Sequence, residues 1–298
     1  MMMPDVIASW VDWLRIDSAA TTCAAYEWEL RHLERWAAAS AADRDVLTLS
    51  KADLARYLAE RRIVQQASDA TVRRSVNALR AFYKFALGSK SPARTIKAPS
   101  VKRRKQRTLN WSQALDVMSV CDTSNALGRR NLAIICLGLD SGLREAELCR
   151  LGVAQLDLGA LRLTVRVKGG ADGDGIFGPH TVAALSSWLA DRPAYALPGV
   201  ESVFVSIGGD TPGRALTPSG LRCIFRRIGR QAGLEHFSPH DLRRSFATMS
   251  HQLGAPTRIV QVAGRWSDLQ MVERYTQALN VSDMAPYSPV SHILRTDT

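Results

Sequence analysis

The sequence predicts a mainly α-helical protein with one small antiparallel β-sheet, divided into two domains. Apolar residues recur at helical spacing through the first hundred residues and again through most of the last two thirds. A single segment, 161–167, alternates apolar and polar side chains as a strand does. The chain has 298 residues, of which 46% are hydrophobic, so it can bury a core in each of two domains.

The first domain is predicted to contain four helices. Ser50 and Ser68 stand where N-capping residues open a helix. The last helix carries an apolar stripe, and its spacing favours a buried face over a platform for stacking nucleic-acid bases. The expected helices are 4–16, 22–39, 51–62 and 70–87, and the stripe comprises Val72, Val76, Leu79, Phe82 and Phe85.

Basic residues are concentrated in the first part of the chain. The net charge is +11, and residues 1–107 contain 20 Lys and Arg against 11 Asp and Glu, whereas residues 108–298 contain 19 against 17. The stretch 88–107 has eight basic residues and no acidic one, with Pro92 and Pro99 keeping it extended. It is either a solvated linker or a segment that lies along a phosphate backbone, and the run of one sign favours the second. We therefore predict a helical domain 1–88, a basic linker 89–107 and a second domain 108–298. The candidate DNA-contacting residues are Arg73, Arg74, Arg80, Lys84, Lys102, Arg103, Arg104 and Lys105.

The second domain is predicted to hold the sheet among helices. Helices are expected at 110–119 and 129–139, and Gly142 is placed to end the second of them. Strands are expected at 156–158, 161–167 and 176–177. The glycines between the last two strands indicate a loop or turn; they are Gly169, Gly170, Gly173 and Gly175. The remainder is expected to be helical.

Several classes of protein are disfavoured by composition. The five cysteines form no C-x-x-C pair, so neither a disulfide framework nor a zinc ribbon is indicated. We see no signal peptide and no apolar run of the roughly 20 residues that a membrane helix needs. His236 and His240 are four apart, but Pro239 argues against one continuous helix through both, so no metal site is expected. We expect a cytoplasmic, nucleoid-associated protein without a metal or other cofactor.

Cationic and titratable side chains recur at positions that suit binding of a phosphate. Arg144 opens a helix in which Glu147 lies one turn along and can hold its guanidinium. His240 and Arg243 project from one face near the start of a helix that Ser238 is expected to cap, where an anion is favoured. Each pattern alone is also common in purely structural roles, such as a buried Arg–Glu pair.

Three further residues complete the candidate set. Lys168 is the only lysine after Lys105 and follows the longest predicted strand; unlike arginine, lysine can give up its proton. Trp266 and Tyr275 stand nine residues apart, Tyr275 on an amphipathic helix expected to follow Ser267. By themselves an incidental surface lysine and two packing aromatics are the ordinary interpretations.

In their order, these residues resemble the tyrosine recombinase, or phage integrase, family in its Xer-like or Cre-like branches. The match consists of Arg-x-x-Glu, a hairpin Lys, His-x-x-Arg, Gly-x-Trp and a Tyr nine residues after the Trp. The resemblance also covers 22–99, which is similar to the family's helical core-binding domain. It implies a catalytic domain of the DNA breaking-rejoining type. The implied catalytic residues are Arg144, Lys168, His240, Arg243, Trp266 and Tyr275, with Glu147 in support.

The resemblance implies that Tyr275 attacks a DNA phosphate and forms a 3′-phosphotyrosine link, without metal or ATP. Such an enzyme acts in integration, excision or resolution of DNA, as a homodimer on each site and a homotetramer at synapsis. A type IB topoisomerase-like enzyme and a catalytically silent DNA-binding regulator remain the alternatives. The sequence departs from the family at Gly264-Arg265-Trp266, where alignment on Trp266 leaves Arg265 without an equivalent role. The hairpin turn also lacks the usual further basic residues, which bears on the assignment of Lys168.

Overall fold

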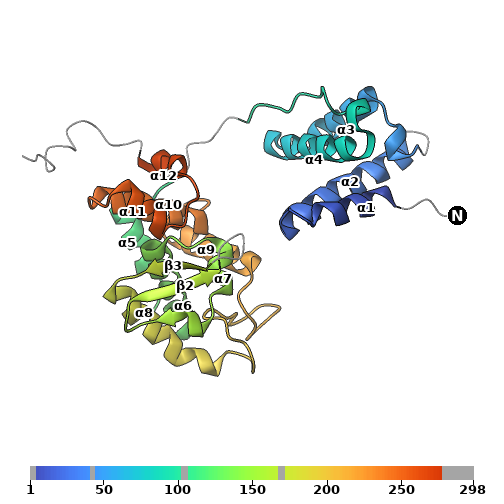
Figure 1. The fold of residues 1–298 in the computed structure, drawn as a ribbon. Helices are drawn as coiled ribbons and strands as arrows, with labels where there is room; N and C mark the ends of the chain where they lie inside the picture. Colours follow the sequence, from blue (N-terminus) through green and yellow to red (C-terminus); the bar gives the residue numbers. More distant parts are fainter. Residues whose placement is uncertain (1–4, 41–43, 102–106, 167–171, 277–298) are drawn as a thin grey trace, which may run out of the picture. The chain divides into compact units, whose positions relative to one another are not determined.

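The computed structural model describes residues 5–40, 44–101, 107–166 and 172–276, without the side chains of Met271 and residues 274–276. These residues form two compact units, which divide between Arg104 and Lys105 (Figure 1). We describe each unit by itself. Among the described residues, no helix has both the length and the apolar character needed to cross a bilayer.

The first unit is a bundle of four helices, as the sequence predicts. Ser50 and Ser68 cap the third and fourth helices by accepting hydrogen bonds from the backbone N–H groups of Asp53 and Thr71. Large side chains fill its core, among them Trp10, Leu33, Tyr57 and Phe82. The helices are α1 (Val6–Leu14), α2 (Ala20–Ser40), α3 (Lys51–Ile63) and α4 (Asp69–Leu87), with short 3-10 turns at η1 (Val46–Thr48) and η2 (Gly88–Lys90).

One residue of the expected apolar stripe on α4 is not in the core. Phe85 is 41% exposed, so that part of the prediction is wrong. Phe82 packs against Trp10 in the middle of α1, whereas Phe85 meets Trp13 near the end of α1, and Trp13 is itself half exposed. Tyr83 is buried instead, and its hydroxyl donates to the carbonyl of Val46.

The chain turns back on the first unit after α4. Gly88 ends the helix with φ = 54°, a left-handed value that a residue with a side chain rarely adopts. The guanidinium of Arg80 then donates to the carbonyl of Ile96, and Ala93 is fully buried in the core of this unit. The predicted role of 89–107 as an interdomain linker stays a prediction.

The second unit combines eight helices with one sheet over its described residues. The helices are α5 (Trp111–Ser119), α6 (Ala126–Ser141), α7 (Glu145–Arg150), α8 (Pro179–Asp191), α9 (Pro218–Gln231), α10 (Pro239–Gln252), α11 (Thr257–Ala263) and α12 (Leu269–Thr276), with 3-10 turns at η3 (Val153–Gln155) and η4 (Arg192–Ala194).

The sheet of this unit is antiparallel, with strand order β1 (Leu156–Asp157), β2 (Arg162–Arg166) and β3 (Asp172–Ile176). The expectation that Gly173 and Gly175 lie in a loop is wrong, because both are in β3 and pair with Val165 and Leu163. Glycine suits the position opposite the buried Leu163 side chain, since a Cβ on Gly175 would lie 2.9 Å from Leu163 Cδ1, and Leu163 would have to shift. Close packing against Leu163 therefore accounts for Gly175.

Helices α10, α11 and α12 lie together at one end of the second unit (Figure 1). Helix α10 also packs on α6, whose end is set by Gly142 in the left-handed conformation, as predicted. A small apolar cluster joins these elements and contains Phe246, Ala247, Val260, Trp266 and Val272. Most of the candidate catalytic residues are carried by this end of the unit.

Candidate active site

Arg144 is held at the start of α7 by Glu147. Its backbone N–H donates to Glu147 Oε2 at 2.9 Å, and its Nη1 lies 2.6 Å from Glu147 Oε1. This is the arrangement expected for residues three apart at a helix start. The side chain of Arg144 is 37% exposed whereas that of Glu147 is 6% exposed, so a buried carboxylate fixes a guanidinium that solvent reaches.

His240 and Arg243 lie on the first turns of α10. Ser238 is the N-cap residue and Pro239 the first residue of α10, as the sequence predicts, and the N–H and hydroxyl of Ser238 both donate to Asp241 Oδ2. Arg243 is only 5% exposed, and its guanidinium donates to the carbonyls of Gly142 and Gly264. His240 is on the exposed side of the same helix.

The segment Gly264-Arg265-Trp266 brings the two arginines to one place. Arg243 Nη2 donates to the carbonyl of Gly264 at 2.5 Å, and Arg144 Nη2 donates to the carbonyl of Arg265 at 2.7 Å. The ring of Trp266 is buried and lies against the Arg243 guanidinium, with 4.1 Å between the ring centroid and Cζ. Two guanidiniums from α7 and α10 therefore meet consecutive carbonyls of one loop.

Arg265 is the site residue that the sequence did not reveal. Its side chain is 6% exposed and points inward, and Nη2 lies 3.3 Å from Glu147 Oε2. The sequence favours Gly264 as the left-handed residue that ends the helix, but in the structure Arg265 takes that conformation, with φ = 56°. Nothing in the sequence indicated that its side chain reaches Glu147.

The charges of the site shift the ionisation of two residues. Burial alone would raise the pKa of Glu147, but hydrogen bonds from Arg144, together with the charge of Arg265, outweigh burial and hold that pKa below its usual value. Partial desolvation lowers the pKa of His240, and the charges of Arg244 and Arg243 act in the same direction. At neutral pH Glu147 is therefore a carboxylate and His240 is mostly a neutral imidazole.

Two of the predicted catalytic residues are not fully described. Lys168 lies outside the described residues, in the segment between β2 and β3. Tyr275 lies on α12, which packs against α10 and α11, but its side chain is outside the description. Helix α12 begins at Leu269, and the Asp268 carboxylate accepts from the N–H of Gln270. The helix thus starts slightly later than the expected start after Ser267.

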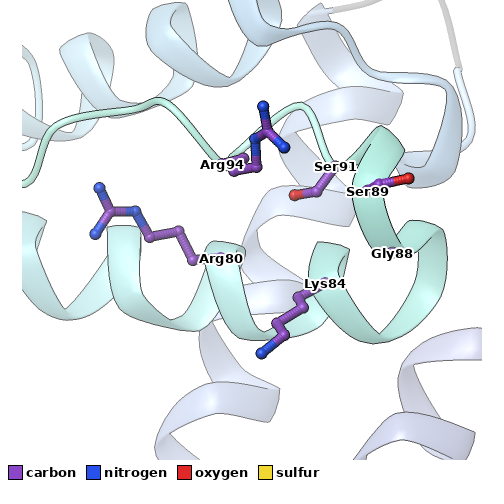
Figure 2. Close-up of a pocket in the computed structure, with 6 residues that line it drawn as sticks. All are labelled: Arg80, Lys84, Gly88, Ser89, Ser91 and Arg94. Carbon is purple, nitrogen blue, oxygen red and sulfur yellow. The ribbon is translucent and has the colours of Figure 1, made fainter.

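A basic hollow is present in the first unit, apart from these residues. It has a volume of about 680 Å³ and lies between the last turns of α4 and the returning chain (Figure 2). Its described lining includes three cations and no carboxylate, and two buried atoms there, Arg80 Nε and Ser91 Oγ, have no hydrogen-bond partner. The lining comprises Arg80, Lys84, Gly88, Ser89, Ser91 and Arg94.

The remaining predicted DNA-contacting residues divide into two groups. Arg73 and Arg74 are exposed on α4. Lys102, Arg103, Arg104 and Lys105 lie outside the described residues.

Sequence comparison identifies both units. Residues 107–281 match the phage integrase family, and residues 7–90 match the N-terminal SAM-like domain of phage integrases. A tyrosine recombinase XerC from Xanthomonas campestris pv. campestris (strain B100) is 32% identical, over 92% of this chain and 83% of the relative. A tyrosine recombinase XerC from Bacillus pumilus (strain SAFR-032) is also 32% identical, over 69% of this chain and 70% of the relative.

Solved structures show the same fold. A XerH site-specific recombinase in a post-cleavage complex with a palindromic difH substrate gives a TM-score of 0.70 at 20% identity, over 96% of this chain and 84% of that one. The Tn1549 transposon integrase in complex with transposon right end DNA gives a TM-score of 0.70 at 18% identity, over 98% and 99% of the two chains.

Fold and site together thus define an enzyme of the DNA breaking-rejoining class with a helical N-terminal domain. The chain belongs to the phage integrase family. Within that family it is a tyrosine-type site-specific recombinase, which confirms the resemblance seen in the sequence.

Proposed function

We propose that this recombinase cleaves and rejoins DNA strands through a covalent 3′-phosphotyrosine intermediate, with Tyr275 as the nucleophile. The observation that carries the proposal is the meeting of Arg144 and Arg243 on the consecutive carbonyls of Gly264 and Arg265. Helix α12, on which Tyr275 lies, begins three residues after Trp266. The chain therefore runs directly from the loop that orients two cations into the helix of the nucleophile.

The guanidiniums of Arg144 and Arg243 bind the non-bridging oxygens of the scissile phosphate. Negative charge on those oxygens increases in the transition state, and preorganised donors stabilise it without reorganising. Trp266 fixes the plane of the Arg243 guanidinium and donates its indole N–H to a phosphate oxygen. Glu147 holds Arg144 in position through their hydrogen-bonded ion pair.

The proton balance assigns the remaining two side chains. The Tyr275 phenol has an ordinary pKa of about 10, so it needs a base, and the neutral imidazole of His240 accepts its proton. The Tyr275 Oη–P bond forms as the P–O5′ bond breaks, and Lys168 protonates the departing 5′ oxygen. The new phosphotyrosine ester conserves the energy of the broken bond, so a 5′-hydroxyl of another strand can reverse the step and exchange partners.

The first unit contributes part of the DNA contacts. We assign the basic hollow of Figure 2 to a backbone phosphate, because Arg80, Lys84 and Arg94 line it and its described lining includes no carboxylate. Lys84 in the last turn of α4 also suits the helix dipole and would not by itself indicate a ligand. The exposed Arg73 and Arg74 and the basic stretch 102–105 supply further phosphate contacts.

We infer the assembly and location from the same function. Strand exchange between two sites needs two subunits on each site, hence a homodimer per site and a homotetramer at synapsis. The enzyme acts on the chromosome or on mobile DNA, and therefore in the cytoplasm with the nucleoid.

The proposal is tested with a suicide DNA substrate that carries a nick close to the cleavage point. Loss of the short released strand prevents religation and traps the protein on DNA. A covalent adduct whose digestion yields a nucleotide linked to Tyr275 supports the proposal. Tight binding without any adduct would instead identify a DNA-binding regulator.

A further inference from the structure

We propose that Arg265 is a positioning residue of the active site, which locks Glu147 and the β2–β3 hairpin together and so sets the orientation of the Arg144 guanidinium. The proposal rests on the function proposed above, because it concerns the same reaction. Arg265 does not touch the phosphate in this scheme; it acts through Glu147 and through its own carbonyl.

The backbone of Arg265 is the first evidence. Helix α11 ends in a Schellman motif, in which the N–H of Trp266 donates to the carbonyl of Gln261 and the N–H of Arg265 donates to the carbonyl of Val262. The residue in the left-handed position of this motif is usually glycine, but here it is Arg265 with φ = 56°. An arginine kept in a backbone conformation that favours glycine points to a task for its side chain.

The contacts of the side chain define that task. Its two terminal nitrogens donate to acceptors on four different elements: the carbonyl of Asp174 on β3 at 3.1 Å, the carbonyl of Ser141 on α6 at 3.1 Å, Glu147 Oε2 on α7 at 3.3 Å, and the carbonyl of Ala263 on α11 at 2.7 Å. A planar guanidinium with five fixed donors can satisfy acceptors in several directions at once, whereas an ammonium is a point charge.

The sheet makes room for this guanidinium. A Cβ on Gly175 would lie 3.2 Å from Arg265 Nη1, tighter than ordinary van der Waals contact. The glycine of β3 therefore admits the arginine next to Asp174. Because β3 closes the hairpin whose connecting segment includes Lys168, Arg265 anchors that hairpin to the loop that binds Arg144 and Arg243.

Glu147 is the link between Arg265 and Arg144. Its Oε1 binds Arg144 Nη1, and its Oε2 is shared by the backbone N–H of Arg144 and by Arg265. Arg144 in turn donates to the Arg265 carbonyl at 2.7 Å. Arg144 is thus oriented by Arg265 in two ways, through the carboxylate and through the backbone.

The experiment is the substitution Arg265→Gly, which removes the guanidinium and relieves the left-handed backbone. Adduct formation is followed on the suicide substrate at saturating DNA, and DNA affinity is measured separately. We expect the cleavage rate constant to fall roughly tenfold to a hundredfold, the scale of a misplaced catalytic group, while the Kd for DNA changes little. Arg265→Lys should recover only part of the rate, since it keeps the charge without the planar fork.

Matched controls separate positioning from folding. Gln66→Gly relieves a second left-handed residue, with φ = 50° in the first unit, and Arg258→Ala removes an arginine from α11; both variants should cleave at the wild-type rate.

If circular dichroism shows that Arg265→Gly does not fold, Arg265→Asn replaces it, because asparagine tolerates the left-handed conformation. In a Glu147→Gln background, the loss caused by Arg265→Gly should be smaller than in the wild-type background, because the part of the effect that passes through the carboxylate has already been removed.

Three outcomes would overturn the proposal: an unchanged cleavage rate for a folded Arg265 variant, a loss confined to DNA affinity, or a full loss in the Glu147→Gln background. The wild-type protein is measured in the same assay. Its failure to form any adduct would contradict the proposed function itself, whereas a wild-type adduct with no effect of Arg265 would contradict only this inference.

Discussion

The guanidinium of Arg243 lies over the indole of Trp266, with its Cζ 4.1 Å from the ring centroid. Both residues are about 5% exposed, so the contact is almost dry. A cation over an indole contributes about 0.5–2 kcal/mol, more when desolvated. Together with the carbonyls of Gly142 and Gly264, the ring fixes the orientation of Arg243 before any substrate binds.

Replacing Trp266 should therefore affect both folding and cleavage. Trp266→Ala removes a buried ring from the cluster with Phe246 and Val260, and we expect a loss of about 3–5 kcal/mol in the free energy of unfolding. Trp266→Phe keeps an aromatic face under Arg243 and should cost less, yet it lacks the indole N–H. Denaturant unfolding checks the order of stability, and equal stability of the two variants would argue against the stacked contact.

Gly142 is a second position where local backbone geometry supports the site. Its φ is 57°, and a Cβ would lie 2.4 Å from Phe246 Cδ1. Gly142→Ala should cost about 1–3 kcal/mol for the conformation alone and more for the clash. Gly199→Ala is the matched control, because Gly199 also has a positive φ but nothing lies within 4 Å of its Cβ position. The two variants should differ clearly in midpoint of unfolding; a similar loss would mean that Phe246 moves aside freely.

The basic hollow of the first unit predicts a salt-dependent effect on DNA binding. Lys84→Ala and Arg94→Ala should each weaken affinity for all sequences and lower the slope of log K against log salt by about one. Arg15→Ala serves as the control, because Arg15 is exposed on the first unit and already paired with Asp12. If the Lys84 and Arg94 variants gave the same salt slope as the control, the hollow would not contact DNA.

The pH dependence of cleavage should report His240. A base must be neutral to accept a proton, and the pKa of His240 lies below its ordinary value. The cleavage rate at saturating DNA should therefore be on a plateau near pH 7 and fall only at pH values below the ordinary histidine pKa of about 6.5. His240→Gln should be slower at pH 7 and should lack that acidic limb. If the cleavage rate of the variant fell at low pH with the same midpoint as the wild type, the titrating group would be one other than His240.

Much of the site's framework follows from local sequence signals. The caps at Ser50 and Ser68, the helix start at Ser238, the stop at Gly142 and the Arg144–Glu147 pair depend on residues three or four apart, and each is present as predicted. Such short-range patterns are determined by helix geometry alone. Helix positions are therefore the part of the fold that one sequence specifies best.

The remainder depends on contacts between distant segments. Gly173 and Gly175 have the composition of a turn, yet they pair with Val165 and Leu163 in a strand, and a Cβ on Gly175 would lie 2.9 Å from Leu163 Cδ1. The role of Arg265 becomes visible only in the folded structure, because its contacts with Ser141, Glu147 and Asp174 join residues 91 to 124 positions apart in the sequence. Phe85 keeps the helical period yet lies where α1 stops covering α4. The roles of Lys168 and Tyr275 remain predictions from the sequence order.

The most direct measurement is adduct formation by the wild-type protein and by Tyr275→Phe on the nicked suicide substrate, with Kd for the uncleaved DNA determined in parallel. Since a phenyl ring lacks only the attacking oxygen, Tyr275→Phe should form no detectable adduct and should bind DNA with nearly unchanged affinity. The peptide crosslinked to DNA in the wild-type reaction should contain Tyr275. A covalent complex that persists in Tyr275→Phe, or that maps to a different residue, would contradict the central claim that Tyr275 is the nucleophile.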